Sequence, residues 1–408
     1  MGVAVNYRPP NKSPCPKLQE LIEQPVDRWS TLFNARQPLN TYKQETNNTL
    51  LIQGLDNLIP IVKANHIHTV FITGDLLSHS FNDTYQHLVT VTHDNKQDYT
   101  QFSYKTISYV LQQLQLRIPN VKIYLALGNN DSDDGDYKLP SSKFLSLLAN
   151  NLSVYVDNKQ QFINSYSNGG YFSVPFTQQV TIIGLNTCIL SSTSSNLSIA
   201  KKQLNWLNQE LAVAATAKRK VIILQHIPYS IDFFKTTKLL GIPVFALDSS
   251  LQNEYLQVLA KYSSTIITIY SGHFHSEYMS LINTQTPQIG TIAFNSGFGN
   301  NPGFKVIDVE SSFAGFTTYY TDLTRKKVEW QQLYSFGQTY GNPKQITTIL
   351  SEFPFTNTAA KVVAYRKYYN ANSINYPQLI NSDDSWKYYY CGINNIHLID
   401  YEKCVTSH

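Results

Sequence analysis

Four apolar, β-branched runs in this chain each end in a short polar motif of one chemical type. In chain order, the runs TVFIT, VKIYLAL, VIIL and TIITIYS lead into Gly74-Asp75, Gly128-Asn129-Asn130, Gln225-His226 and Gly272-His273-Phe274-His275. Each motif offers carboxylate, amide or imidazole groups at the carboxyl end of an expected strand, where open α/β sheets build their sites. A fold that uses these motifs together must bring four strand ends to one edge.

Strand-like and helix-like segments alternate along most of the chain. The expected strands are Thr69–Thr73, Val121–Leu127, Val180–Leu185, Lys220–Leu224, Thr265–Tyr270 and Thr291–Asn295. The expected helices are Thr41–Asn65, Tyr99–Leu116, Ser142–Asn150, Lys201–Ala215 and Ser250–Tyr262. This alternation predicts an α/β core of layered sheets flanked by helices.

The pattern changes after Pro302. The runs Lys305–Val309, Gly315–Asp322 and Lys327–Tyr334 indicate an antiparallel meander. The Tyr- and Asn-rich stretch from Gln345 to His408 is expected to be mostly helical. We therefore expect one compact domain over residues 1–340 and a C-terminal helical subdomain over residues 341–408, with no flexible linker between them.

Composition excludes several classes of protein. The 32 Lys and Arg residues against 28 Asp and Glu give a net charge of only +4, too small a bias to indicate nucleic-acid binding. Charged residues make up 15% of the chain, so uncharged polar side chains must carry most of the hydrophilic surface. No apolar run approaches the roughly 18 residues that cross a bilayer, and the first residues lack the apolar core of a signal peptide. The chain as written therefore predicts neither a transmembrane anchor nor a leader.

The four cysteines have different expected roles. Cys188 lies in the apolar run TIIGLNTCIL and is expected to be a core thiol. Cys391 and Cys404 close a short loop and could form a disulfide in an oxidising compartment. Two thiols in a cytosolic protein fit their spacing equally well.

Taken singly, each polar motif is weak evidence. A lone Gly-Asp after a strand is usually an ordinary turn, and a lone His there is usually a hydrogen-bonded edge residue. The acidic run Asp131–Tyr137 has loose calcium-loop spacing but lacks the closing Glu, so a surface loop is expected. The joint occurrence of the four motifs favours a shared site. Two divalent cations about 3.5–4 Å apart can share one carboxylate, and imidazole with amide ligands suits Zn, Mn or Fe better than Ca.

These motifs make the sequence similar to the calcineurin-like metallophosphoesterases, and within them to the acid sphingomyelinase-like phosphodiesterases and their endopolyphosphatase relatives. The narrower resemblance rests on GDLLSH, which ends at His79, on Gly299–Val309 (GNNPGFKVIDV), on TTYYTDLTRKKVEWQQLYSF and on the closing segment YYCGINNIHLIDYEKC. It extends from about Cys15 to Cys404. The resemblance implies a four-layer αββα sandwich of two mixed sheets, with residues 1–340 as the catalytic domain.

Carried over residue by residue, the resemblance makes Asp75 the ligand that bridges two metal ions. Asn129, His226 and His273 would be ligands of one ion, and His275 a ligand of the other. His79 would lie over the substrate phosphate as a hydrogen-bond donor or general acid.

The chain departs from the family pattern at two points. The family opens with a strand that ends in Asp-x-His and supplies two ligands to the metal that His275 also binds, and this motif is absent here. Gly2–Tyr7 (GVAVNY) could fill the strand position but offers only Asn6 and Tyr7 as polar groups. Either the start is truncated or replaced, or the second metal site is expected to be weak. The usual Gly-Asn-His is also replaced, by Gly128-Asn129-Asn130. Asn130 can donate a hydrogen bond but no proton near neutral pH, which favours substrates with good leaving groups.

The expected function is hydrolysis of a phosphodiester or phosphoanhydride by in-line attack of a metal-bound hydroxide. The substrate would be a small phosphorylated molecule: a phosphodiester, nucleotide, polyphosphate or phospholipid head group. The family resemblance and the candidate disulfide imply a secreted or otherwise extracytoplasmic location. We also expect a monomer. The alternative is a non-catalytic relative that binds phosphorylated ligands or a protein partner, supported by the missing Asp-x-His and by Asn130.

Overall fold

The computed structural model describes residues 16–33, 38–89, 95–193, 196–283, 285–295, 297–309, 313–356, 358–373, 382–395 and 397–408. Its strands are β1 (Thr69–Ile72), β2 (Lys122–Leu125), β3 (Phe172–Pro175), β4 (Val180–Gly184), β5 (Lys220–Leu224), β6 (Ile266–Ser271), β7 (Met279–Ile282), β8 (Thr286–Gly290), β9 (Gly303–Asp308), β10 (Gly315–Tyr320) and β11 (Gln331–Ser335).

The helices fall into three groups along the chain. Before β3 lie α1 (Pro16–Glu23), α2 (Trp29–Leu32), α3 (Asn48–Ala64), α4 (Phe81–Leu88), α5 (Asn95–Arg117), α6 (Ser142–Leu152) and α7 (Lys159–Gly169). Between β4 and β6 lie α8 (Leu197–Thr216), α9 (Phe233–Lys238) and α10 (Ser249–Lys261). After β11 come α11 (Phe336–Tyr340), α12 (Ile346–Ser351), α13 (Ala360–Tyr369), α14 (Asp383–Asn394) and α15 (Leu398–Ser407).

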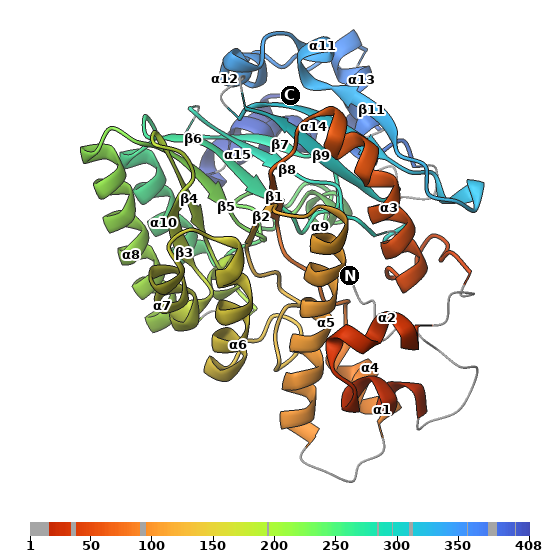
Figure 1. The fold of residues 1–408 in the computed structure, drawn as a ribbon. Coiled ribbons are helices and arrows are strands. Elements are labelled where there is room, and N and C mark those ends of the chain that lie inside the picture. The colour runs from red at the N-terminus through yellow and green to blue at the C-terminus, as the bar shows by residue number, and fades with distance from the viewer. Residues whose placement is uncertain are drawn as a thin grey trace.

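The strands form three sheets. The largest is mixed and has the order β3-β4-β5-β6-β8-β7, with β4, β5, β6 and β8 parallel. β1 and β2 form a parallel pair, and β9, β10 and β11 form an antiparallel sheet in the order β11-β10-β9. In Figure 1, α8 and α10 lie on one side of the strands and α3 on the other. The expected α/β class and layered architecture are confirmed, although the strands outside the large sheet are divided between two small sheets.

The large sheet is buried on both faces because its side chains alternate between two apolar clusters. Ile183 and Ile223 pack with α8 and α10, whereas their neighbours Ile182 and Ile222 pack with β2 in the main core. A strand covered on both faces needs a continuous apolar run rather than alternation. The sequence VIIL supplies that run in β5.

One expected strand is wrong. Thr291–Asn295 is irregular, and the strand lies just before it, at β8. β7 and β8 form a hairpin against β6, and the amide of Thr291, which donates to Ser271 O, is the last contact of that ladder. The other expected strands are present, including the antiparallel meander after Pro302. Gly2–Tyr7, the candidate for the missing first strand, lies outside the described residues.

The expected helix Thr41–Asn65 begins only at Asn48. The Asn47 side chain caps it by accepting a hydrogen bond from the amide of Leu50. The residues before the cap, Glu45 among them, therefore form a loop.

The segment expected to be helical at the C-terminus contains α12 to α15, while a domain boundary at residue 340 stays a prediction. Cys391 and Cys404 form a disulfide with a Cα–Cα distance of 5.6 Å, which joins α14 to α15. Cys188 is buried in the core, as expected.

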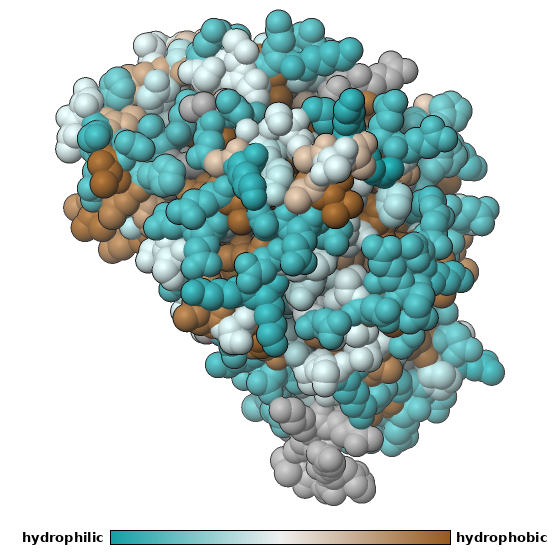
Figure 2. All heavy atoms as spheres, turned by 90° about the vertical axis from the view of Figure 1, so that its left-hand side faces the viewer, coloured by the Kyte–Doolittle hydropathy of each residue, from teal (hydrophilic) through white to brown (hydrophobic). Residues whose placement is uncertain are grey.

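Among the helices that the structure describes, none is long and apolar enough to cross a membrane. The side that carries α8 is largely hydrophilic despite the low content of charged residues (Figure 2).

Candidate metal centre

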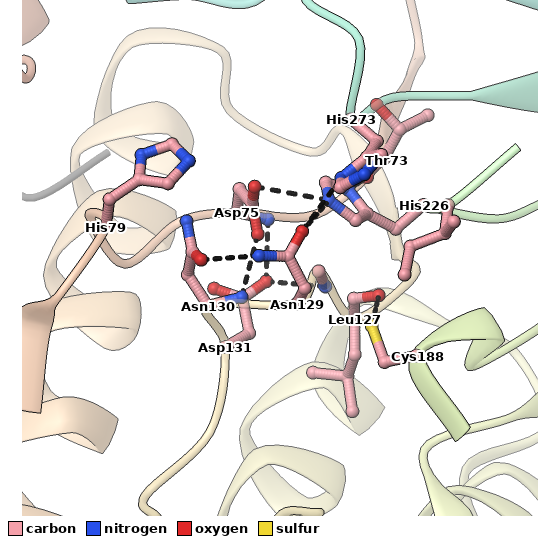
Figure 3. A network of polar contacts seen from close by, with 12 residues as sticks. Thr73, Asp75, His79, Leu127, Asn129, Asn130, Asp131, Cys188, His226 and His273 are labelled. Carbon is pink, nitrogen blue, oxygen red and sulfur yellow. Dashed lines mark hydrogen bonds and ion pairs between the residues drawn. The ribbon is translucent and has the colours of Figure 1, made fainter. Parts of the chain in front are cut away.

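The four polar motifs meet at the carboxyl ends of β1, β2, β5 and β6. β1 pairs in parallel with β2, and β5 pairs in parallel with β6, so within each pair the motifs leave at the same end. Asp75, Asn129, His226 and His273 come together there, as Figure 3 shows. The predicted convergence of these four residues is therefore present in the structure.

Three short contacts define the cluster. His226 Nε2 lies 2.9 Å from Asn129 Oδ1 and 3.1 Å from Asp75 Oδ2. His273 Nδ1 lies 2.9 Å from the same Asn129 oxygen. One amide oxygen thus faces two imidazoles, one of which also faces a carboxylate.

Contacts behind the cluster fix which atoms point inward. His226 Nδ1 lies 2.6 Å from Thr73 O, and because a carbonyl oxygen only accepts, Nδ1 carries a proton and donates. The Asn129 amide nitrogen donates to Asn130 Oδ1 at 2.6 Å, which turns Asn129 Oδ1 toward the imidazoles. In a neutral ring, His226 Nε2 then presents a lone pair to two oxygens. Such an arrangement requires a positive charge at this point, either a proton or a metal cation.

The pKa shifts of the clustered side chains also fit a cation among them. Burial opposes the charge on Asp75, but His226 and the amide of Asn130 outweigh it and hold the pKa of Asp75 well below its usual range. Burial likewise opposes the charge on His226, and the Asp75 carboxylate raises the His226 pKa above its ordinary value. Burial lowers the pKa of His273, and lowers that of His275 to about 4, so both imidazoles stay neutral. Neutral imidazole is the form that binds metal ions.

His275 lies beside the four-residue cluster rather than in it. Positive φ angles at His273 and His275 turn the chain between them, and Phe274 N donates to Gly272 O. The His275 ring packs 4.9 Å from Phe298 and 6.1 Å from His79, centroid to centroid. Its Nδ1 is buried and has no hydrogen-bond partner among the described residues.

His79 is held by a residue that the sequence did not reveal. Its Nδ1 lies 2.8 Å from Glu45 Oε1, and its ring packs edge-on against Phe298. Burial lowers the pKa of His79, but Glu45 and Asp75 outweigh that effect and raise it overall. Glu45 lies 34 residues earlier in the chain and belongs to no motif, so no signal in the sequence marks it.

Asn130 lies between His79 and the cluster of Asp75, Asn129, His226 and His273 (Figure 3). Its backbone amide donates to Asp75 Oδ1 at 3.0 Å. Its side-chain nitrogen is buried and lacks a hydrogen-bond partner among the described residues. In Figure 3 this nitrogen points toward the side where His79 lies. A donor is therefore available beside the cluster.

Two glycines and one carboxylate hold together the turn that follows β1 and the turn that follows β2. A Cβ on Gly128 would come within 2.1 Å of Asp75 N, and one on Gly74 would come within 2.4 Å of Gly128 N. The Asp131 carboxylate accepts hydrogen bonds from the amides of Asp75, Leu77 and Gly128. The expected surface loop Asp131–Tyr137 is therefore wrong at its start, since Asp131 is fully buried. Its position directly after Asn130 is the signal that could have revealed it.

The donor types of the cluster are ones that hold a divalent cation. The described residues contain no group of three or more His, Cys, Asp or Glu side chains placed to hold a metal. The amide oxygen of Asn129, however, lies between His226 and His273 and offers a further oxygen donor. For a second ion, the predicted residues offer only Asp75 and His275.

Comparison with known proteins identifies the class of this protein. Residues 51–277, more than half of the chain, match the calcineurin-like phosphoesterase family. The chain therefore belongs to this family of phosphoric ester hydrolases, whose members bind divalent metals.

The curated relatives identify the branch. The chain is 23% identical to the cyclic GMP-AMP phosphodiesterase SMPDL3A of Mus musculus, over 74% of this chain and 72% of the relative. It is 22% identical to the acid sphingomyelinase-like phosphodiesterase 3b of Mus musculus, over 70% of this chain and 67% of the relative. Sphingomyelin phosphodiesterase B of Dictyostelium discoideum is 26% identical over 58% of this chain and 39% of its own length. The resemblance to the acid sphingomyelinase-like branch is confirmed.

Proposed function

We propose that this chain hydrolyses a phosphodiester or phosphoanhydride bond of a small phosphorylated substrate at the carboxyl ends of β1, β2, β5 and β6. The observation that carries the proposal is the meeting of Asp75, Asn129, His226 and His273, whose carboxylate, amide and imidazole groups face one point and are the donor types that hold a divalent cation. When bound, divalent ions such as Zn, Mn or Fe would polarise the phosphoryl group and supply a nucleophile at neutral pH.

Each residue of the cluster has a defined part in holding the ions. Asn129, His226 and His273 would hold one ion, and Asp75 would bridge it to a second. His275 would be a ligand of the second ion, since its buried Nδ1 has no hydrogen-bond partner among the described residues. With only two predicted protein ligands, the second ion would be held weakly.

Asn130 and His79 form the substrate side of the site. The Asn130 side-chain nitrogen would donate to a phosphoryl oxygen, and His79, held by Glu45, would donate from the other side. Because Asn130 supplies no proton, substrates with good leaving groups are favoured. Nucleotide phosphodiesters, polyphosphates and phospholipid head groups remain within this class. Two of these are represented among the relatives, by a cyclic GMP-AMP phosphodiesterase and a sphingomyelin phosphodiesterase. The disulfide Cys391–Cys404 supports a secreted or otherwise extracytoplasmic location.

Hydrolysis of bis(p-nitrophenyl) phosphate by the dialysed protein, with and without added Mn or Zn, tests this function. We expect about one tightly held metal by elemental analysis and activity that rises with excess metal. Asp75→Asn should lower both metal content and rate, the rate by at least about 100-fold. Asp157→Asn is the matched control, because the Asp157 side chain is 72% exposed and pairs with Lys122 at the surface.

Parent-like hydrolysis by Asp75→Asn would show that the site lies elsewhere. A metal-loaded parent without activity on any phosphoester would instead support the non-catalytic alternative.

A further inference from the structure

Four large apolar side chains are exposed on α9 and on the turn that follows it. Their exposed fractions are 38% for Phe234, 49% for Leu239, 84% for Leu240 and 66% for Ile242. A single exposed apolar side chain is ordinary at a protein surface, but several within one short segment indicate a contact surface. We call these four side chains the α9 patch.

The turn that carries Leu240 is held in one conformation. Its backbone closes on α9, because the amide of Gly241 donates to Thr236 O. Tyr388 in α14 donates from its hydroxyl group to Leu240 O at 2.9 Å. The Tyr388 ring also packs directly against Gly241, since a Cβ there would lie 2.2 Å from it. The α9 patch is therefore presented on a fixed turn.

The requirements of folding do not explain a leucine at position 240. Its φ angle is +53°, in the left-handed region that residues with a Cβ rarely adopt. Glycine or asparagine would adopt this conformation at a lower cost. The leucine side chain is almost fully exposed, so it adds little burial in return. A strained, exposed apolar residue is the kind of outlier that indicates a function.

The charges within this segment are positive. Lys238 Nζ lies 3.9 Å from the centroid of the Phe234 ring, and the side chain of Lys235 is 60% exposed. Phe233–Leu247 contains no acidic residue. The carboxylate of Asp232, which pairs with Lys235, precedes the segment and is largely buried. Exposed apolar side chains bordered by lysines are typical of segments that lie in the interface of an anionic membrane.

We propose that the α9 patch binds the surface of a membrane that contains anionic lipids. Leu239, Leu240 and Ile242 would enter the head-group region. Lys238 would remain among the head groups, because the apolar stem of a lysine can lie along an apolar surface while its ammonium group stays in water. The proposal concerns attachment to the surface and stands whether or not the chain hydrolyses phosphoesters.

The α9 patch lies close to the candidate metal centre. Phe233, at the start of α9, packs against Phe274 with the ring centroids 6.4 Å apart. Phe274 lies between His273 and His275 in the chain, so α9 rests on the turn that carries both histidines. The helix has six residues and is about 9 Å long. Attachment through its end would therefore hold the metal centre near the lipid head groups.

Co-sedimentation of the full chain with vesicles tests the proposal. We expect the parent to bind vesicles of phosphatidylcholine with about one-third phosphatidylserine, and to bind pure phosphatidylcholine much more weakly. Leu240→Gly removes the apolar side chain and relieves the left-handed strain. It should lower the partition coefficient by about tenfold, while its Tm equals or exceeds that of the parent. Lys238→Gln should lower the partition coefficient by about fivefold.

Two variants on α8 are the matched controls. Val213 is 66% exposed and Lys202 is exposed, so Val213→Ala and Lys202→Gln remove the same kinds of group from another surface. Neither should change vesicle binding.

A parent that stays in solution with both kinds of vesicle would overturn the proposal, as would binding that is unaffected by Leu240→Gly. Equal binding to pure phosphatidylcholine would overturn the assignment to an anionic surface. A parent that ignores vesicles but forms a dimer, which Leu240→Gly abolishes, would assign the α9 patch to a second copy and overturn the proposal as well.

Discussion

At the scale of single residues, the donor atoms of the metal centre owe their directions to partners outside it. Thr73 O fixes the His226 ring, and Asn130 Oδ1 fixes the Asn129 amide. The sequence predicted the residues whose side chains point into the centre, because each follows an apolar run. It could not predict Glu45, because a contact between a loop and a histidine 34 residues later leaves no periodic signal.

Glu45→Gln should weaken the hold on His79 and change the pH dependence of the reaction. The carboxylate is one of the groups that raise the pKa of His79 against the effect of burial, so its removal lowers that pKa. If protonated His79 donates to the substrate, the alkaline limb of kcat/KM moves to lower pH. We expect kcat/KM to fall about tenfold at pH values above this limb and to change little at acid pH.

A pH profile of kcat/KM measures this effect, with Glu329→Gln as control because Glu329 lies at the surface and pairs with Lys327 and Arg325. An unchanged pH profile for Glu45→Gln would show that Glu45 does not position His79.

Asn130→His should reduce the dependence of the rate on the leaving group. In the parent, Asn130 offers only a hydrogen bond, so turnover should fall steeply as the leaving group becomes more basic. An imidazole at this position can donate a proton, which should flatten the slope. Rates over a series of phenyl phosphodiesters measure it. Equal slopes for the two proteins would contradict a role for Asn130 beside the leaving group.

At the scale of elements, the structure departs from expectation where strands are short and carry turn residues. β1, β2, β5 and β6 were predictable because their residues are continuously apolar and β-branched. β8 (TPQIG) contains both Pro and Gly, which argue against a strand, and it is held by pairing with β6 and β7. The expected strand one step later, Thr291–Asn295, has the better local sequence but no partner strand among those described. Long-range pairing therefore outweighed local preference.

Gly128→Ala should push apart the turn that follows β1 and the turn that follows β2. Its Cβ would meet the backbone of Asp75 at 2.1 Å, and because backbone cannot rotate away, the turns must shift. We expect a loss of stability of about 1–3 kcal/mol and a larger relative loss of phosphodiesterase activity. Gly337→Ala is the control, since its Cβ would meet only Pro343 at an ordinary 3.6 Å. Urea unfolding measures stability; equal midpoints for Gly128→Ala and the parent would contradict the close contact.

At the scale of the whole molecule, the layered α/β architecture followed from the alternation of strand-like and helix-like segments. The division of β1 and β2 from β9, β10 and β11 among the described residues did not, because the apolar runs do not show which strands pair. The pairing of Cys391 with Cys404 was also open, since a spacing of 13 residues fits a bridge and two thiols equally well. Helix packing decides it: α14 and α15 lie side by side, which brings the two sulfur atoms together.

Cys404→Ser should destabilise the C-terminal helices without altering the metal centre. The bridge closes a loop of 13 residues, and its loss should cost about 3 kcal/mol through the entropy of the unfolded chain. For a chain of this length, that corresponds to a fall in Tm of about 3–4 °C. Reduction of the parent with dithiothreitol should reproduce the fall, while the variant should not respond to it. Hydrolysis rates below the transition should match the parent, because the bridge joins α14 to α15 and the residues of the centre follow β1, β2, β5 and β6. A variant that melts at the parent's temperature, or a parent indifferent to reductant, would mean that the bridge does not hold these helices.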